Sequence, residues 1–228
     1  VAKKGAELLA IAKEKNCNFF FEASVGGAIP IIRPLHKCLA ANEITAIAGI
    51  LNGTTNFMLT NMTNNGSDYA DVLKQAQALG YAELHPEADI EGWDPCRKIA
   101  ILTSLVSGQL VDYNDVYTEG ITKITPADFE YAKELGKTIK LIAMSKETED
   151  GKFAMVSPRM IGDESPLSSV KDVFNGILVH SNMLDDSMYY GRGAGKLPTA
   201  SAVVSAWNGE TSPAFAFLSF LKIFPIVF

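Results

Sequence analysis

The sequence has few cysteines and few histidines, which limits the kinds of metal and redox site that it can form. Its 228 residues include three of each, and the cysteines are Cys17, Cys38 and Cys96. An odd number of cysteines at these spacings fits neither a disulfide framework nor a zinc site. We therefore expect buried, reduced thiols in a cytoplasmic protein, with a catalytic role for Cys96 near a helix start as the alternative.

The sequence also lacks a block of basic residues and a hydrophobic run long enough to cross a membrane. Lys and Arg number 20 against 26 Asp and Glu, which gives a net charge of −6. No basic cluster is interleaved with aromatic residues, so we expect no nucleic-acid partner. The apolar stretch at residues 214–228 is too short for a membrane span and contains Lys222 and Pro225, so we expect no membrane partner.

The pattern of apolar residues and turn residues predicts alternating helices and strands. Several of the strands are joined by short turns, which favours an α+β domain with a mixed β-sheet covered by helices over a doubly wound sheet. The predicted strands are 19–21, 44–51, 119–124, 138–146, 153–161 and 174–180, and the predicted helices are 2–15, 31–41, 54–64, 69–79, 94–107, 126–135 and 198–207.

The most informative segment is acidic and is followed by a lysine on a predicted buried helix. A solvated acidic loop would explain the composition alone. However, Lys98 lies on the same side of the helix as Leu102 and Leu105, so its ammonium should point into a cleft and require carboxylate partners. A lysine among carboxylates suits general acid–base chemistry on an alcohol. The acidic residues are Glu83, Glu87, Asp89, Glu91 and Asp94.

Two glycine-containing segments have both a structural and a functional interpretation. Residues 22–30 place a glutamate before a glycine-rich turn, whose carbonyl oxygens could hold a monovalent cation, although a tight turn between strand and helix is the simpler interpretation. Residues 191–195 form a glycine loop before a helix, and its amides could contact a cofactor or substrate. A lone glycine pattern without a preceding strand is weak support for that function.

Four blocks of the sequence resemble the catalytic domain of homoserine dehydrogenases, in the family's order. They are FFEASVGGAIPIIRPL, GILNGTTNFML, GYAELHPEADIEGWDPCRKIAIL and GRGAGKLPTASAVVS. The resemblance implies that residues 19–205 are the catalytic and dimerisation domain. Residues 1–18 are then a remnant of the NAD(P)-binding Rossmann domain, and 206–228 are an atypical tail.

The resemblance also implies roles for individual residues. Lys98 corresponds to the family's acid–base lysine, and Asp94 to the carboxylate that orients it. Glu83 and Asp89 correspond to groups that bind the amino end of the substrate, and Gly53 and Thr54 to the turn that approaches it. Gly193 corresponds to the loop near the nicotinamide. The residues that correspond to a site for a monovalent cation such as sodium are Glu22, Val25, Gly27 and Ile29.

The implied activity is the reversible, NAD- or NADP-dependent oxidation of L-homoserine to L-aspartate 4-semialdehyde. The resemblance places this reaction in threonine, methionine and isoleucine biosynthesis, in a cytoplasmic homodimer. The sequence departs from the family in lacking the Rossmann half before Val1, in having His85 where Asp or Asn is usual, and in diverging after Ser205. A non-catalytic oligomerisation or regulatory fragment, and a semialdehyde dehydrogenase that uses Cys96 as its nucleophile, are the alternatives.

Overall fold

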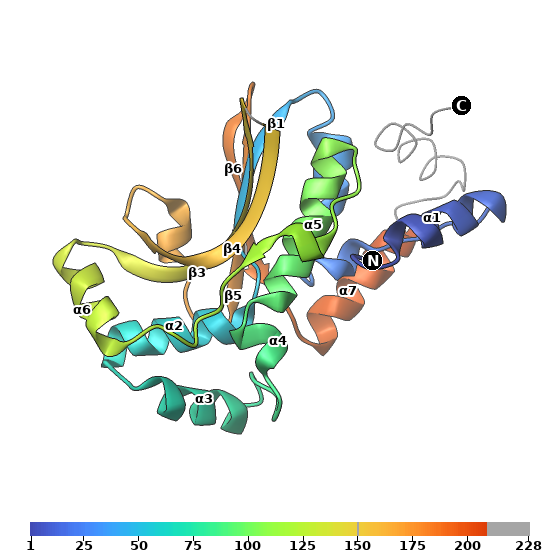
Figure 1. Ribbon diagram of the computed structural model, residues 1–228. Coiled ribbons are helices and arrows are strands. Elements are labelled where there is room, and N and C mark those ends of the chain that lie inside the picture. The colour runs from blue at the N-terminus through green and yellow to red at the C-terminus, as the bar shows by residue number, and fades with distance from the viewer. Residues whose placement is uncertain (150, 209–228) are drawn as a thin grey trace.

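A six-stranded β-sheet forms the centre of the protein in the computed structural model, which describes residues 1–149 and 151–208 (Figure 1). The strand order is β2-β4-β3-β1-β5-β6. β2 and β4 are parallel, and every other pair is antiparallel, so the expected α+β fold with a mixed sheet is confirmed. The strands are β1 Ile44–Ile50, β2 Tyr117–Thr118, β3 Thr138–Thr148, β4 Gly151–Ile161, β5 Phe174–Ser181 and β6 Asp185–Arg192.

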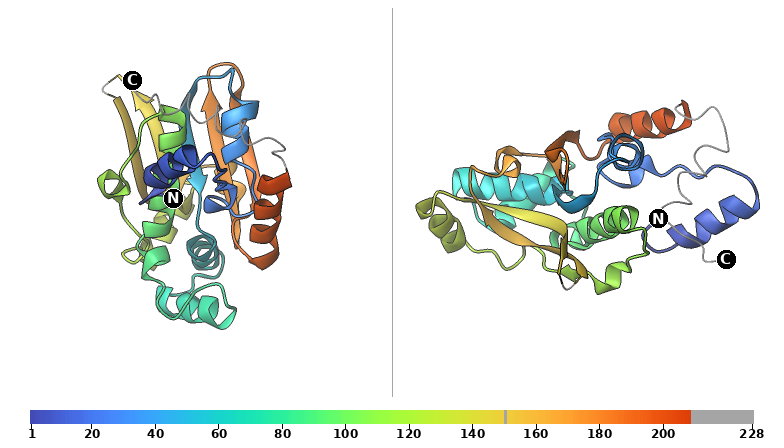
Figure 2. Two further views of the ribbon diagram at one scale, coloured as in Figure 1. Left: turned by 90° about the vertical axis from the view of Figure 1, so that its right-hand side faces the viewer. Right: turned by 90° about the horizontal axis from the view of Figure 1, so that it is seen from above.

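Helices lie along one face and across one end of this sheet. α5 runs beside one face, while α2, α3 and α4 lie across the lower end in Figure 1. α1 and α7 are at one end of the molecule and α6 is at the opposite end (Figure 2). The helices are α1 Gly5–Glu14, α2 Gly53–Asn65, α3 Tyr69–Ala78, α4 Glu87–Ile90, α5 Trp93–Ser107, α6 Pro126–Glu134 and α7 Lys196–Asn208.

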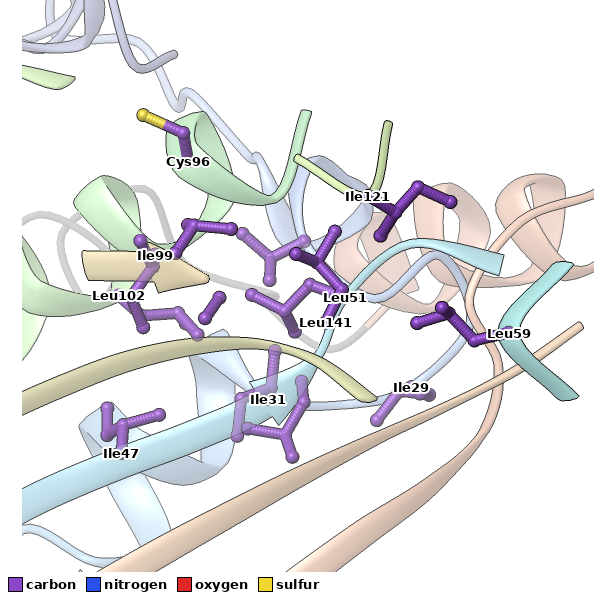
Figure 3. Packing of buried hydrophobic residues seen from close by; sticks show 14 of the residues in the cluster. Ile29, Ile31, Ile47, Leu51, Leu59, Cys96, Ile99, Leu102, Ile121 and Leu141 are labelled. Atoms are coloured by element: carbon purple, nitrogen blue, oxygen red, sulfur yellow. The ribbon is translucent and has the colours of Figure 1, made fainter. Parts of the chain in front are cut away.

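The main core lies between the sheet and helices α2 and α5. Ile47 of β1 and Leu141 of β3 are buried in one cluster with Leu59 of α2 and Leu102 of α5 (Figure 3). From Ile99 to Leu105 α5 is buried all round because its other side is covered as well, and Leu9 of α1 lines an apolar cavity with Leu105 there. This packing fixes the beginning of α5, and therefore Lys98, relative to the end of β1.

The opposite face of the sheet is only partly covered. Ile50 and Ile142 are buried there against Leu167 of η4 (Pro166–Ser169) and Val170. Farther along the same face, partly exposed apolar side chains pack beside this cluster, and they include Ala48, Met144, Leu178 and Met188. An apolar sheet face of this kind is typical of a surface that another protein covers.

The structure differs from the predicted secondary structure in three segments. Residues 19–21 form no strand and lead into a 3-10 turn, Glu22–Ser24. Residues 119–124 also form no strand. The two residues just before them, which make up β2, pair with β4. β6 was not predicted because its polar start, Asp185-Asp186-Ser187, hides the alternation, yet it pairs along its whole length with β5. The glycine loop therefore does follow a strand and precedes α7.

Several helix boundaries and the cysteines also differ from expectation. α2 begins at Gly53 after its Asn52 cap rather than at residue 54, and α5 begins at Trp93 rather than at residue 94, so that Asp94 lies in its first turn. Of the predicted helix 31–41, only residues 32–38 are helical, and Pro34–Cys38 among them form a π-helical segment. Cys96 is buried as expected, but Cys17 and Cys38 are exposed. The Phe-rich stretch at 214–228 lies outside the described residues.

Candidate active site

Lys98 and Asp94 form the centre of a polar cluster at the start of α5. They are one helical turn apart, and Lys98 Nζ lies 2.7 Å from Asp94 Oδ2. Lys98 Nζ also donates a hydrogen bond to the carbonyl oxygen of Leu51, at 2.8 Å. The Lys98 side chain is 17% exposed, so it is mostly buried at one side of the cluster.

Asn52 joins this pair to a second carboxylate. Its Nδ2 donates to Asp94 Oδ2 at 2.8 Å and to Asp89 Oδ1 at 2.7 Å, while its Oδ1 accepts from the backbone N–H of Thr55. Asn52 is the residue that caps α2 directly after the buried strand β1. One buried amide therefore fixes the start of a helix and the spacing of two carboxylates.

Asp89 comes from the short helix α4, in a segment for which no helix was predicted. Thr54 Oγ1 lies 3.1 Å from Asp89 Oδ2 and 2.6 Å from the carbonyl oxygen of Tyr81. Burial raises the pKa of Asp89, and the negative charge of Asp94 raises it further. The hydrogen bonds from Asn52 and Thr54 and the charge of Lys98 act in the opposite direction.

The cluster therefore joins four of the predicted residues: Lys98, Asp94, Asp89 and Thr54. Gly53, between Asn52 and Thr54, lies against the Val173 carbonyl, which would be 2.9 Å from a Cβ at this position. The side chain of Glu83 is exposed and, among the described residues, no hydrogen bond to its carboxylate is recorded. His85 is exposed, with Nδ1 3.9 Å from Glu87. Asn52 was not predicted as a site residue, although its position between a buried strand and the start of a helix is apparent from the sequence.

Glu22 and the turn that follows it form a second polar site. The Glu22 carboxylate accepts backbone hydrogen bonds from Ile31, Ile32 and Arg33 at 2.8–2.9 Å, and so caps the short helical segment that begins there. Val25 and Ile29 are almost fully buried. Within the described residues, no hydrogen bond to the carbonyl oxygens of Val25, Gly27 or Ile29 is recorded. Unpaired buried carbonyl oxygens of this kind are suitable ligands for a small cation.

The glycine loop contacts this second site directly. A Cβ on Gly27 would lie 2.5 Å from the carbonyl oxygen of Gly193, so only glycine permits this approach. On its other side Gly193 lies against the amide of Asn175, which is buried and has no hydrogen-bond partner in the described structure. The structure thus brings together the turn at 25–29 and the loop at 191–195, which are far apart in the sequence.

Cys96 does not have the surroundings of a nucleophile. It is fully buried, and its Sγ lies 3.3 Å from the carbonyl oxygen of Tyr113. Burial raises the pKa of its thiol, which disfavours the thiolate that nucleophilic attack requires. Within residues 1–149 and 151–208, no three His, Cys, Asp or Glu side chains gather where they could hold a metal ion. No helix in that part of the chain has the length and apolar character needed to cross a membrane.

Comparison with known sequences identifies the family to which this chain is similar. A family model described as homoserine dehydrogenase matches residues 30–206. The homoserine dehydrogenase of Bacillus subtilis strain 168 is 46% identical over 205 residues, which are 90% of this chain and 47% of that protein. That of Neisseria gonorrhoeae is 47% identical over 205 residues, with the same coverage. The chain thus spans about half of the length of the curated relatives that it matches.

Solved structures give the same result. The crystal structure of a homoserine dehydrogenase from Thiobacillus denitrificans superposes with a TM-score of 0.88 and 41% identity, over 97% of this chain and 50% of that one. A hyperthermophilic archaeal homoserine dehydrogenase mutant in complex with NADPH superposes with a TM-score of 0.77 and 29% identity, over 92% and 61% of the two chains. Both are similar to this chain over nearly all of its described length.

Proposed function

Since the chain belongs to the homoserine dehydrogenase family, we propose that its residues 19–205 are the catalytic domain of an enzyme that reversibly oxidises L-homoserine to L-aspartate 4-semialdehyde. The observation that carries this proposal is the cluster in which Asn52 holds Asp89 and Asp94 beside Lys98. The cofactor is NAD or NADP, which is bound largely outside this chain. Residues 1–18 are then the end of the dinucleotide-binding domain.

In this proposal Lys98 moves the proton at the substrate's C4 oxygen. During aldehyde reduction its ammonium donates a proton to that oxygen, and during alcohol oxidation the neutral amine takes the hydroxyl proton. A bound nicotinamide ring supplies or accepts the hydride. The hydrogen bonds from Lys98 Nζ to Asp94 and to the Leu51 carbonyl fix the direction in which the amine points. Orientation of this kind contributes to rate because the reacting atoms start close to their productive geometry.

The carboxylates of Asp89 and Glu83 bind the ammonium group of the substrate. Asp89 is oriented for this by Asn52 and Thr54, and a cationic ligand would offset the unfavourable burial of its charge. Glu83 is exposed and would contribute only when substrate is present. Gly53 and Thr54 form the wall at which the substrate enters.

The turn at residues 25–29 holds a monovalent cation such as sodium. The ligands are the carbonyl oxygens of Val25, Gly27 and Ile29, together with a remaining lone pair of the Glu22 carboxylate. Among the described residues no hydrogen bond reaches those carbonyl oxygens, which supports this assignment. Because Gly193 packs on Gly27, an ion at the turn would also stiffen the loop that contacts the nicotinamide.

The protein acts as a cytoplasmic homodimer in threonine, methionine and isoleucine biosynthesis. Support for the dimer comes from the half-covered sheet face, where Met144, Leu178 and Met188 are partly exposed. A second copy of the same face would cover these apolar side chains with its own apolar side chains, as happens at two-fold interfaces. A specific interface would bury more than about 1,000 Å² in total.

The test is a steady-state assay of the full-length protein with L-homoserine and either NAD or NADP, followed by the absorbance of the reduced nicotinamide. Turnover with L-homoserine, and none with L-serine, is the expected result. Absence of turnover with both dinucleotides, with and without sodium, would instead support a non-catalytic oligomerisation or regulatory fragment. Retention of the four-residue cluster argues against that alternative.

A further inference from the structure

Lys140 of β3 is a charged residue in the interior that the proposed chemistry does not use. It is 3% exposed and lies on the same side of the strand as the buried Ile142. Its Nζ donates to the Val170 carbonyl oxygen at 2.5 Å and to Asn56 Oδ1 at 3.1 Å. Among the described residues no carboxylate forms an ion pair with it. Burying an ammonium group that has only two neutral partners is energetically unfavourable, and a methionine would fill the same space without a charge.

The partners of Lys140 show which part of the molecule it holds. By donating to Asn56 Oδ1, Lys140 fixes the orientation of that amide. Asn56 Nδ2 can then donate only toward the carbonyl oxygens of Val170, Asp172 and Phe174, which lie 3.0–3.3 Å away. Thr60 Oγ1, one turn farther along α2, accepts from the Asp172 N–H at 3.2 Å. The segment 170–174 is therefore held on α2 by Thr60 and by Asn56, and the orientation of the Asn56 amide depends on Lys140.

This segment is in turn packed on the substrate-side end of α2. The carbonyl oxygen of Val173 lies so close to Gly53 that a Cβ there would be 2.9 Å from it. The preceding residue, Asp172, has a φ of 54°, an unfavourable conformation for a residue other than glycine. Surrounding contacts must hold such a residue in place, and those from Asn56 and Thr60 do so. Gly53 lies between Asn52 and Thr54, the two side chains that orient Asp89.

We propose that Lys140 is a positioning residue for the substrate-binding turn: through Asn56 and the segment 170–174 it fixes Gly53, and with it Asn52 and Thr54, at the start of α2. This inference rests on the proposed function, because it assigns a task to a residue remote from the reacting atoms. Figure 1 shows the arrangement that permits it, with α2 lying across the end of the sheet where β3 begins. Burial also lowers the pKa of Lys140 to about 8, consistent with an ammonium that the fold does not stabilise by an ion pair.

The first test compares Lys140→Met with Lys146→Met in the full-length enzyme. Lys146 is on the same strand but exposed, so its substitution removes a like charge without touching Asn56. For Lys140→Met we expect kcat/KM for L-homoserine to fall about 10- to 100-fold, while the KM for the dinucleotide stays unchanged. Lys146→Met should match the wild type. Equal loss of affinity for both substrates, or no loss, would overturn the proposal.

The second test does not depend on activity. Hydrogen exchange of this chain should become faster in Lys140→Met at the first turn of α2 and at residues 170–174, with α5 unchanged. Lys140→Gln, which keeps a donor, serves if the methionine variant does not fold, and should show a smaller change at the same amides. Unchanged exchange at both segments would contradict the inference. If the wild type lacks homoserine turnover yet exchange changes as described, the proposed function fails while the coupling stands.

Discussion

At the scale of single residues, the site depends on an amide that holds two carboxylates near each other. Asp89 and Asp94 would repel one another, and Asn52 donates to both while Lys98 neutralises one of them. The second carboxylate, Asp89, keeps an unfavourably buried charge, and burial raises its pKa. Such a cost at one residue is typical of a binding site that waits for a cationic group.

We therefore expect Asp89→Asn to stabilise the protein and weaken substrate binding. The folded-state pKa of Asp89 lies above its ordinary value of 3.8. Between the unfolded-state and folded-state pKa values the folded protein therefore binds more protons than the unfolded chain, and its stability falls as pH rises. At neutral pH the substitution should raise stability by roughly 0.5–2 kcal/mol, as removal of functional strain often does, and raise the KM for L-homoserine. Thermal melts at pH 7 check this, with Glu83→Gln as the exposed control. A lower melting temperature for Asp89→Asn would be contrary to this account.

The buried Lys140 gives a pH dependence of the opposite sign. Burial, then the charge of Lys171, lower its pKa from 10.5 to about 8, against a smaller effect of Asp172. Between these values the unfolded chain binds more protons, so stability rises with pH. Relative to Lys140→Met, the wild type should gain up to about 3 kcal/mol between pH 8 and pH 10.5. Urea titrations of both proteins measure the difference, and parallel curves across this range would show that the ammonium is not buried as described.

The spacing of Asp94 and Lys98 allowed their contact to be predicted because both lie on one helix. Asp89 could be assigned to the same cleft only through the resemblance, since its chain segment looked irregular. Asn52 was missed because its two carboxylate partners are 37 and 42 residues away and are brought to it by the packing of α5 and α4 against the end of β1. Local patterns cannot show such contacts.

At the scale of elements, the Glu22 carboxylate holds the short helical segment after the glycine turn. It accepts three backbone N–H groups that would otherwise lack partners at a helix start. Glu22→Gln should lower the free energy of unfolding by about 1–2 kcal/mol, since a charged acceptor is replaced by a neutral one. Glu7→Gln, which removes an exposed contact with Lys4, should cost less than about 0.5 kcal/mol. Equal losses in chemical denaturation would show that the cap contributes little.

Most elements with clear periodicity were predicted, among them α5, α6, β3, β4 and β5. Residues 19–21 were wrongly predicted as a strand because three consecutive phenylalanines resemble a buried strand, whereas in the described part of the chain they join no β-sheet and lead into the Glu22–Ser24 turn. β6 was missed because its sequence does not resemble a buried strand. It is an edge strand with polar residues, and its pairing with β5 stabilises it more than its own propensity does.

At the scale of the whole molecule, the half-covered sheet face predicts a homodimer. Light scattering on a chain shortened to end at Ser205 should still give a dimer, because the sheet and not the Phe-rich tail makes the interface. Leu178→Lys, on that face, should shift the protein toward monomer, whereas Leu197→Lys, at an 83% exposed position of α7, should not. A monomeric shortened chain at micromolar concentration would assign the association to the tail instead.

If Lys98 transfers the proton at the C4 oxygen of homoserine, Lys98→Ala in the full-length enzyme should lose this step and keep its fold. The ammonium contacts Asp94 and the Leu51 carbonyl at the wall of the cluster, so its removal should leave the fold and calorimetric homoserine binding in place. We predict that kcat falls by about 10² to 10⁴ in both reaction directions. Near-wild-type turnover in a folded Lys98→Ala enzyme would exclude this role for Lys98.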